Sequence, residues 1–266
     1  MKKLHFEYSM QILFENPVRQ HRFTLKCFPC SSERQQIYGL TMDVFPKEFF
    51  AASNDSFGNY CLYGYSEGEH DHFSVSVTGT ALTGLSSFEA ARPAYQLGLF
   101  RYQTDYTAPG RQLLAFYKNF SFPREMSNLD KALAFQETLH REFRYVPGAT
   151  TLYTTAEQAM ELGQGVCQDY SHILLSLCRM EKIPCRYVVG MLIGEGLSHA
   201  WVEIFDNDNW IALDPTNNLI VNEDHIKISS GRDYNDCIIN QGIFTGQTRQ
   251  TQTIHVSVSE LQSCNE

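Results

Sequence analysis

The chain has 266 residues, of which 43% are hydrophobic and 19% charged, with a formal net charge of −9 at pH 7. This composition is typical of a globular protein with one large domain or two smaller ones. The net charge is negative, and the sequence contains no cluster of Lys and Arg that could neutralise phosphates. Nucleic acid is therefore not an expected partner. Because no apolar run approaches a membrane span and eight cysteines occur without a secretory signal, we expect a cytoplasmic protein with free thiols and no membrane partner.

The first third of the chain predicts an antiparallel β-sandwich. Alternating polar and apolar residues, with many aromatic and β-branched side chains, indicate strands separated by short turns. The predicted strands cover residues 4–14, 22–28, 60–65 and 72–78. Residues 85–109 are irregular and contain prolines, which is typical of a connector. We therefore assign residues 1–100 to a sandwich domain with its connector, and residues 101–266 to a second domain.

Beyond residue 109 the pattern changes to helices followed by strands, which is typical of an α+β domain. Apolar spacing predicts helices at residues 109–120, 127–144, 155–162 and 167–180. Alternation predicts strands at residues 186–193, 198–205, 210–213, 226–229, 236–239 and 251–258. The last residues, 262–266, are expected to fray.

Cys167 begins the helix that follows the sequence Gly163-Gln164-Gly165-Val166. The two glycines permit a tight turn, so the sulfur should lie near the helix N-terminus. Unpaired N–H groups and the helix dipole favour a thiolate at that position. A nucleophile benefits from this placement, whereas a buried structural cysteine does not need it.

A cysteine nucleophile needs a base within hydrogen-bond reach and a group that orients the base. His172 follows Cys167 by five residues and therefore points about 140° away on a helix. We interpret His172 as a hydrogen-bonded structural histidine. By the same geometry Asp169 lies on the far side of the helix, and Cys178 is expected to be a core thiol.

A predicted hairpin supplies a better base in His199. If Asn207 and Asp208 form a two-residue loop between the strands, Asp214 lies opposite Trp201. Asp214 is then the diagonal neighbour of His199 on the same face, close enough for a hydrogen bond between the imidazole and the carboxylate. The hairpin therefore predicts a base and its orienting group together.

Three other motifs resemble metal or redox sites but lack the full pattern, so we expect no metal and no cofactor. Cys27 and Cys30 form a single CxxC without a second pair, which favours ordinary packing. His70-Asp71-His72 is interpreted as a polar turn. Asp206-Asn207-Asp208-Asn209 begins like a calcium loop but lacks the glycine at the sixth position and the glutamate at the twelfth.

Four sequence blocks resemble the transglutaminase-like superfamily, and in particular its bacterial members with a β-rich N-terminal domain. The blocks are GQGVCQDY at 163–170, IPCRYVVG at 183–190, SHAWVE at 198–203 and LDPTN at 213–217. The resemblance implies a papain-like core in which Cys167 is the nucleophile, His199 the base and Asp214 the orienting carboxylate. This assignment agrees with the one obtained from helix and hairpin geometry.

The implied chemistry is acyl transfer through a thioester on Cys167. The oxyanion would be stabilised by the N–H of Cys167 and a second donor, for which Tyr145 and Gln164 are candidates. We expect a hydrolase of peptide, isopeptide or related amide bonds, acting on a peptide or protein substrate. Two alternatives remain open, a cross-linking transglutaminase with an amine acceptor and a non-catalytic binding module of the same fold.

Overall fold

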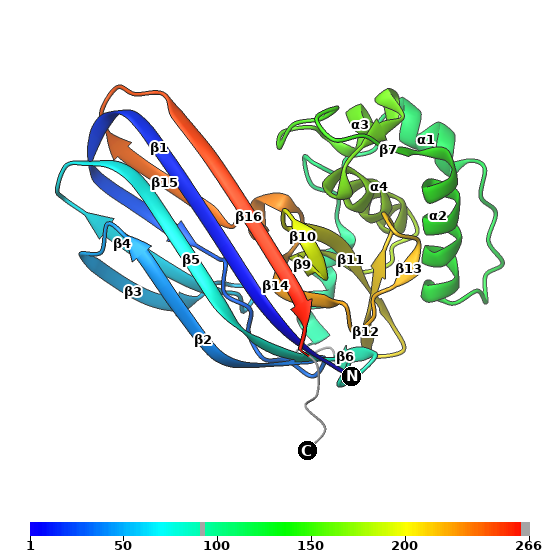
Figure 1. Ribbon diagram of the computed structural model, residues 1–266. Coiled ribbons are helices and arrows are strands. Elements are labelled where there is room, and N and C mark those ends of the chain that lie inside the picture. Colours follow the sequence, from blue (N-terminus) through cyan, green and yellow to red (C-terminus); the bar gives the residue numbers. More distant parts are fainter. Residues whose placement is uncertain (91–93, 262–266) are drawn as a thin grey trace, which may run out of the picture.

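The computed structural model describes residues 1–90 and 94–261 and is mostly β, with two large curled sheets (Figure 1). The α-helices gather beside the smaller sheet, on the side away from the larger one. The expected fraying of residues 262–266 lies outside the described residues. Among the described helices, none combines the length and apolar character that a membrane crossing requires.

The larger sheet has eight strands and joins both ends of the chain. They are β1 (Lys2–Leu25), β2 (Gln35–Phe45), β3 (Phe49–Asn54), β4 (Tyr60–Ser66), β5 (His70–Thr83), β10 (Gly194–Gly196), β15 (Asn240–Thr245) and β16 (Gln250–Glu260). The first part of β1 pairs with β5 and β16, whereas its last part pairs with β4 and β15. The strands predicted at 4–14 and 22–28 are therefore two parts of one strand, which continues between its two sets of partners and ends at Leu25.

The C-terminal strands complete the N-terminal sheet. β16 pairs antiparallel with β1 from Leu4 opposite Glu260 to Phe14 opposite Gln250. The predicted division at residue 100 consequently runs between strands that are hydrogen-bonded in space. Local alternation cannot report such a pairing, since the partners lie more than two hundred positions apart in the sequence.

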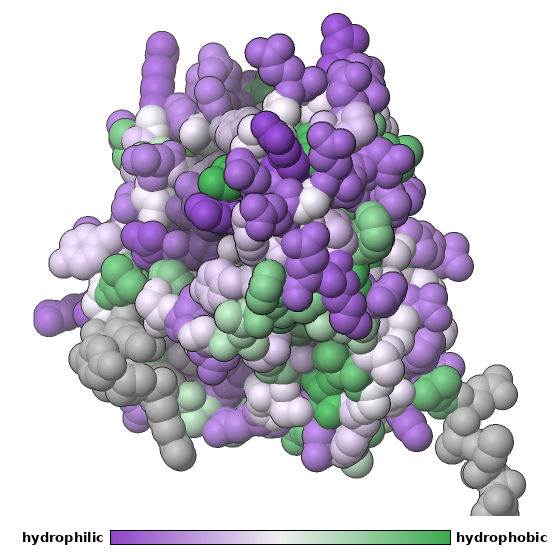
Figure 2. Space-filling model, turned by 90° about the vertical axis from the view of Figure 1, so that its left-hand side faces the viewer, coloured by the Kyte–Doolittle hydropathy of each residue, from purple (hydrophilic) through white to green (hydrophobic). Residues whose placement is uncertain are grey.

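Several predictions for this half needed correction. β2 and β3 were not predicted, although Leu40, Met42 and Val44 alternate with Thr41 and Asp43 in β2; most side chains of both strands are exposed. Figure 2 shows the side of the molecule on which the larger sheet lies, with hydrophobic residues interspersed among hydrophilic ones. The strand predicted at 236–239 is replaced by a short 3₁₀ helix, η2 (Tyr234–Cys237).

His70-Asp71-His72 was predicted to be a polar turn but opens strand β5. His70 is buried, with its Nε2 3.1 Å from Nδ1 of buried His21. Burial, with a smaller contribution from His70, lowers the pKa of His21 to about 4. His21 is thus neutral at pH 7, and both rings are buried in the N-terminal core.

The smaller sheet has six strands and carries the helices. Its strands are β6 (Phe88–Ala90), β9 (Cys185–Leu192), β11 (His199–Asp206), β12 (Asn209–Asp214), β13 (Leu219–Ile220) and β14 (His225–Gly231). The helices are α1 (Arg111–Tyr117), α2 (Asn128–Glu142), α3 (Ala156–Leu162) and α4 (Cys167–Met180), close to the predicted positions. A 3₁₀ helix, η1 (Ala94–Arg101), precedes them, and a short parallel pair joins β7 (Arg144–Tyr145) to β8 (Gln164–Gly165).

The six-stranded sheet is a central layer between two hydrophobic cores. Ala200, Val202 and Ile204 of β11 pack in the core that contains the helices, as the alternation predicted. Met191 of β9 and Ile226 of β14 belong instead to the core of the N-terminal strands. Because both faces of the sheet are buried, its strands are held in position from two sides.

The connector is anchored by a buried ionic network. Glu89 on β6 accepts hydrogen bonds from Arg186 at 2.8 Å and Lys227 at 2.9 Å, and both cations also contact Glu203. Burial alone would raise the pKa of Glu89, but the charges of Lys227 and Arg186 lower it to about 2. The network ties β6 to β9, β11 and β14, so this part of the connector is an ordered strand.

Candidate active site

Cys167 is the first residue of α4, as predicted, and its side chain is partly exposed. Asp169 folds back toward the helix start, where its Oδ2 accepts the N–H of Val166 at 2.7 Å and the hydroxyl of Thr150 at 2.6 Å. A Cβ on Gly165 would lie 2.4 Å from the same oxygen. The glycine and the buried carboxylate together shape the turn that presents the sulfur, a role of Asp169 that helical geometry alone did not reveal.

The hairpin formed by β11 and β12 has the predicted register. Asp206 pairs with Asn209 and Val202 pairs with Leu213, so Asn207 and Asp208 form a two-residue loop. Both loop residues have positive φ angles of 45° and 64°, a conformation that Asn and Asp tolerate better than most residues. This register brings His199 and Asp214 to the same face.

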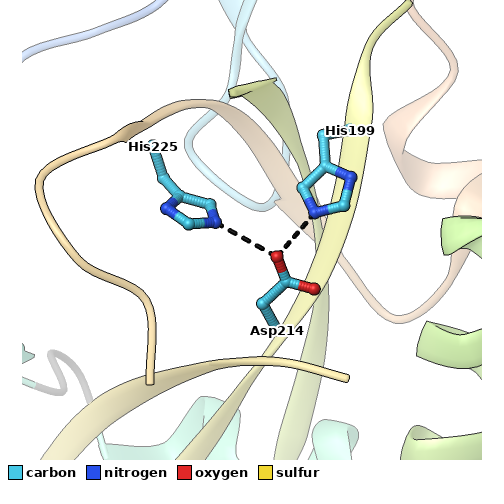
Figure 3. Close-up of side chains that lie close together, drawn as sticks. All are labelled: His199, Asp214 and His225. Carbon is cyan, nitrogen blue, oxygen red and sulfur yellow. Dashed lines mark hydrogen bonds and ion pairs between the residues drawn. The ribbon is translucent and has the colours of Figure 1, made fainter. Parts of the chain in front are cut away.

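His199 and Asp214 are joined by a hydrogen bond of 2.7 Å between Nε2 and Oδ2 (Figure 3). Asp214 is fully buried, and its Oδ1 accepts the N–H groups of Thr216 and Asn217 at 3.0 and 3.2 Å. The amide of Asn217 also donates to Oδ2 at 2.7 Å. Although burial opposes it, the hydrogen bonds from His199 and His225, the charge of His199 and the amide of Asn217 hold the pKa of Asp214 well below its usual range.

His199 is also largely buried, which by itself would lower its pKa. Its interactions with Asp214 and with Cys167 outweigh burial and raise the pKa of His199 to about 10. The ring is therefore an imidazolium at neutral pH. Because Nε2 is bonded to Asp214, Nδ1 is the nitrogen that is left for the sulfur.

A third residue, His225, was missed by the sequence analysis. Its Nε2 lies 3.2 Å from Oδ2 of Asp214, so two imidazole rings converge on one oxygen (Figure 3). His225 begins β14, which pairs with β9 and not with β12. In the sequence, His225 directly precedes the strand predicted at 226–229. The hairpin geometry that placed Asp214 beside His199 does not include this strand, so it could not predict the contact between His225 and Asp214.

Two family models match the chain. The bacterial transglutaminase-like N-terminal region matches residues 4–81, and the transglutaminase-like superfamily core matches residues 120–215. The chain belongs to the transglutaminase-like superfamily. Its matched core includes Cys167, His199 and Asp214.

The chain is also similar to other proteins and to a solved structure. An uncharacterized protein of Mycobacterium leprae is 35% identical over 127 residues, covering 44% of this chain and 45% of that protein, less than half its length. An uncharacterized protein of Mycobacterium tuberculosis is 25% identical over 267 residues, covering 86% and 83% of the two chains. A crystal structure named "putative cysteine protease", from Cytophaga hutchinsonii, matches 98% of this chain and 91% of that chain at 22% identity with a TM-score of 0.78, a likeness of fold.

His172 is a structural residue of the transglutaminase-like core, as predicted. It is fully buried between the rings of Tyr106 and Tyr187, with centroid separations of 4.8 and 5.0 Å, and its Nε2 accepts the N–H of Tyr234 at 3.2 Å. Burial, assisted by the charge of Arg179, lowers the pKa of His172 to about 3. His172 is therefore neutral and enclosed, and does not face the sulfur of Cys167 as a base would.

One group in the described part of the chain has the composition of a metal site, namely His199, Asp214 and His225, whose ligand atoms all lie within 4.8 Å of one another. However, both Nε2 atoms approach the same carboxylate oxygen at hydrogen-bond distances of 2.7 and 3.2 Å. Zinc ligands would instead surround a common point at about 2 Å. The donor arrangement fits a hydrogen-bonded cluster better than a metal centre of this transglutaminase-like protein.

The remaining candidates have distinct surroundings. Cys178 is fully buried in the helix core, which confirms its interpretation as a core thiol. Tyr145 is 54% exposed, and burial together with the charge of Cys167 raises its pKa. The side-chain oxygen of Gln164 accepts a hydrogen bond from Arg144 at 3.3 Å. Tyr145 is thus the candidate oxyanion donor that is electrostatically coupled to the sulfur.

Proposed function

We propose that this protein is a cysteine-dependent acyl-transfer enzyme that hydrolyses peptide, isopeptide or related amide bonds of a peptide or protein substrate. In this proposal Cys167 is the nucleophile, His199 the general base and acid, and Asp214 the group that orients His199. The α+β core is taken to be papain-like, with its nucleophile on a helix and its base on the adjoining sheet, and the N-terminal strands to be a sandwich.

The observation that carries the proposal is the buried hydrogen bond of 2.7 Å between His199 and Asp214, on a hairpin whose histidine also interacts with Cys167. A structural histidine could be neutral, as His172 is. His199 instead remains protonated at neutral pH while facing a thiol at a helix N-terminus. A thiolate–imidazolium pair is the resting state that cysteine hydrolases use.

The reaction follows from this arrangement. The thiolate of Cys167 attacks the amide carbon, and the carbonyl oxygen becomes an oxyanion that accepts the N–H of Cys167 and a second donor, for which we propose Tyr145. The intermediate collapses, the C–N bond breaks, and the amine leaves with the proton from His199. Neutral His199 then takes a proton from water, the hydroxide adds to the thioester, and the acid departs as the thiolate and imidazolium are restored.

The first experiment measures the reactivity of the sulfur without a substrate. Iodoacetamide near neutral pH is expected to alkylate Cys167 much faster than the other cysteines, as resolved by peptide mass spectrometry. Cys30 is the matched control, since this residue is also exposed at the surface. Partial desolvation of its sulfur raises the pKa of its thiol, so it should react slowly. Equal rates at Cys167 and Cys30 would refute the activated nucleophile.

The second experiment identifies the reaction. Peptide and isopeptide reporters are screened with and without a primary amine, and the products are identified by mass spectrometry. Hydrolysis by the wild-type protein, lost in Cys167→Ala but retained in Cys30→Ala, supports the proposal. Products that contain the amine in place of water would assign the cross-linking alternative, and turnover by Cys167→Ala would exclude both.

A further inference from the structure

His225 is a buried histidine for which the proposed reaction has no direct use. It is 5% exposed, and its ring lies on the other side of Asp214 from His199, with 6.0 Å between the two ring centroids (Figure 3). We propose that His225 is a positioning residue that acts as an imidazolium: it holds Asp214 in place and balances its charge, so that His199 can give up its proton during catalysis. This inference rests on the proposed function.

The hydrogen bonds of His225 indicate its protonation state. Nε2 faces Oδ2 of Asp214 at 3.2 Å, and Nδ1 faces Oδ1 of Asn222 at 3.1 Å. The Asn222 oxygen also accepts the N–H of Asp224 at 3.0 Å, which determines the end of the amide at which the oxygen lies. A ring placed between two acceptors must donate from both nitrogens, and only the imidazolium form can do so.

The other charged groups near His225 already have partners: Arg34 donates to the backbone oxygen of Val221 at 2.8 Å, and the remaining groups pair with one another. A small cavity beside His225 is lined by the ionisable side chains of Arg34, Glu89, Glu203 and Lys227. Glu89 and Glu203 both contact Lys227 and Arg186. Asp224, next in sequence to His225, pairs with Lys2 at 2.7 Å. Asp214 is therefore the carboxylate that remains for His225.

The charges of the site then alternate from the sulfur inward. Thiolate Cys167 is followed by imidazolium His199, carboxylate Asp214 and imidazolium His225. If His225 were absent, the whole negative charge of Asp214 would act on His199 and bind its proton more tightly. A base that holds its proton too tightly is a poor acid for the leaving amine. His225 thus keeps His199 oriented while limiting the attraction between His199 and Asp214.

The test uses the full-length protein and an alkylating probe, so it requires no substrate. Iodoacetate is anionic and reacts fastest while His199 is protonated beside the thiolate, so its rate falls when that proton is lost. His225→Phe is expected to move this alkaline fall upward by about one pH unit, because a neighbouring positive charge is removed. His225→Gln retains an N–H donor for Asp214 but no charge, and should show the same upward shift.

His70→Gln is the matched control, because His70 is another buried histidine with a histidine partner, located in the N-terminal sheet. It should leave the iodoacetate profile unchanged. An unchanged profile in folded His225→Phe would overturn the inference, whereas slow, unselective alkylation of wild-type Cys167 would overturn the proposed function itself. Nitrogen NMR of the wild-type protein decides the case even if the variants fail to fold: we expect both ring nitrogens of His225 to carry protons at pH 7, and a neutral ring would contradict the proposal.

Discussion

The core beneath α4 and the edge of the adjoining hairpin each bury a histidine, and the two histidines respond in opposite ways. His172 lies between two tyrosines and accepts one backbone N–H, so burial lowers its pKa to about 3. His199 has the buried carboxylate of Asp214 and the sulfur of Cys167 as neighbours, and its pKa is raised to about 10. The difference teaches that hydrogen-bond partners, and not burial, decide whether a buried imidazole can serve as a proton carrier.

The strongest test of this difference between His172 and His199 is the substitution of Asp214. Asp214→Asn should leave His199 without its negative partner and lower kcat by about 10³- to 10⁴-fold, as expected when an orienting carboxylate is neutralised. The measurement is reporter hydrolysis by variants whose circular dichroism matches the wild-type protein.

A matched control lies at the other end of the same hairpin. Asp206 is also buried, and its carboxylate accepts the N–H of Asn128 at 3.2 Å. Asp206→Asn should keep kcat within a few-fold of the wild-type value. If Asp214→Asn were equally mild, Asp214 would have no role in orienting His199.

His172, a buried residue of α4, should affect stability and not catalysis. Since the pKa of His172 is lowered in the folded state, the unfolded chain binds an additional proton between about pH 6.5 and 3. The free energy of unfolding of the wild-type protein should therefore decrease as pH falls through this window, with His172 contributing up to about 1.4 kcal/mol per pH unit. His172→Phe should reduce this slope, as measured by urea denaturation between pH 4 and 8.

The same variant has an internal control above pH 7, where His172 is neutral in both states and the two slopes should coincide. His172→Phe should also retain the pH profile of hydrolysis, because its ring does not contact Asp214. A shifted profile would mean that the two histidines are coupled.

The smallest predicted effect concerns Asn217, whose side chain donates one of several hydrogen bonds to Asp214 at 2.7 Å. Asn217→Ala should lower kcat about 3- to 10-fold, less than the full energy of a hydrogen bond to a charged group because other donors to Asp214 remain, with KM unchanged. Asn217→Asp should be more harmful than Asn217→Ala, because it adds a second negative charge beside the buried carboxylate. Equal kcat values for the two variants would indicate that the Asn217 side chain does not contact Asp214 in solution.

Much of this site could be predicted from the sequence because its parts are local. The position of Cys167 follows from a glycine turn and the apolar periodicity of one helix. The pairing of His199 with Asp214 follows from a two-residue loop and the alternation of two adjacent strands. Both rely on relations within about twenty residues, which backbone geometry determines directly.

The sequence by itself therefore determined the succession of strands, helices and strands along the chain, the helix that carries Cys167 and the hairpin that joins His199 to Asp214. Only the tertiary structure decided that β16 completes the sheet of β1, and that His225 reaches Asp214 from a strand paired with β9. These contacts depend on the packing of segments that are distant in the chain or on different strands of a curled sheet. No local pattern encodes such contacts, because they form only when the two cores bury the central sheet from both sides.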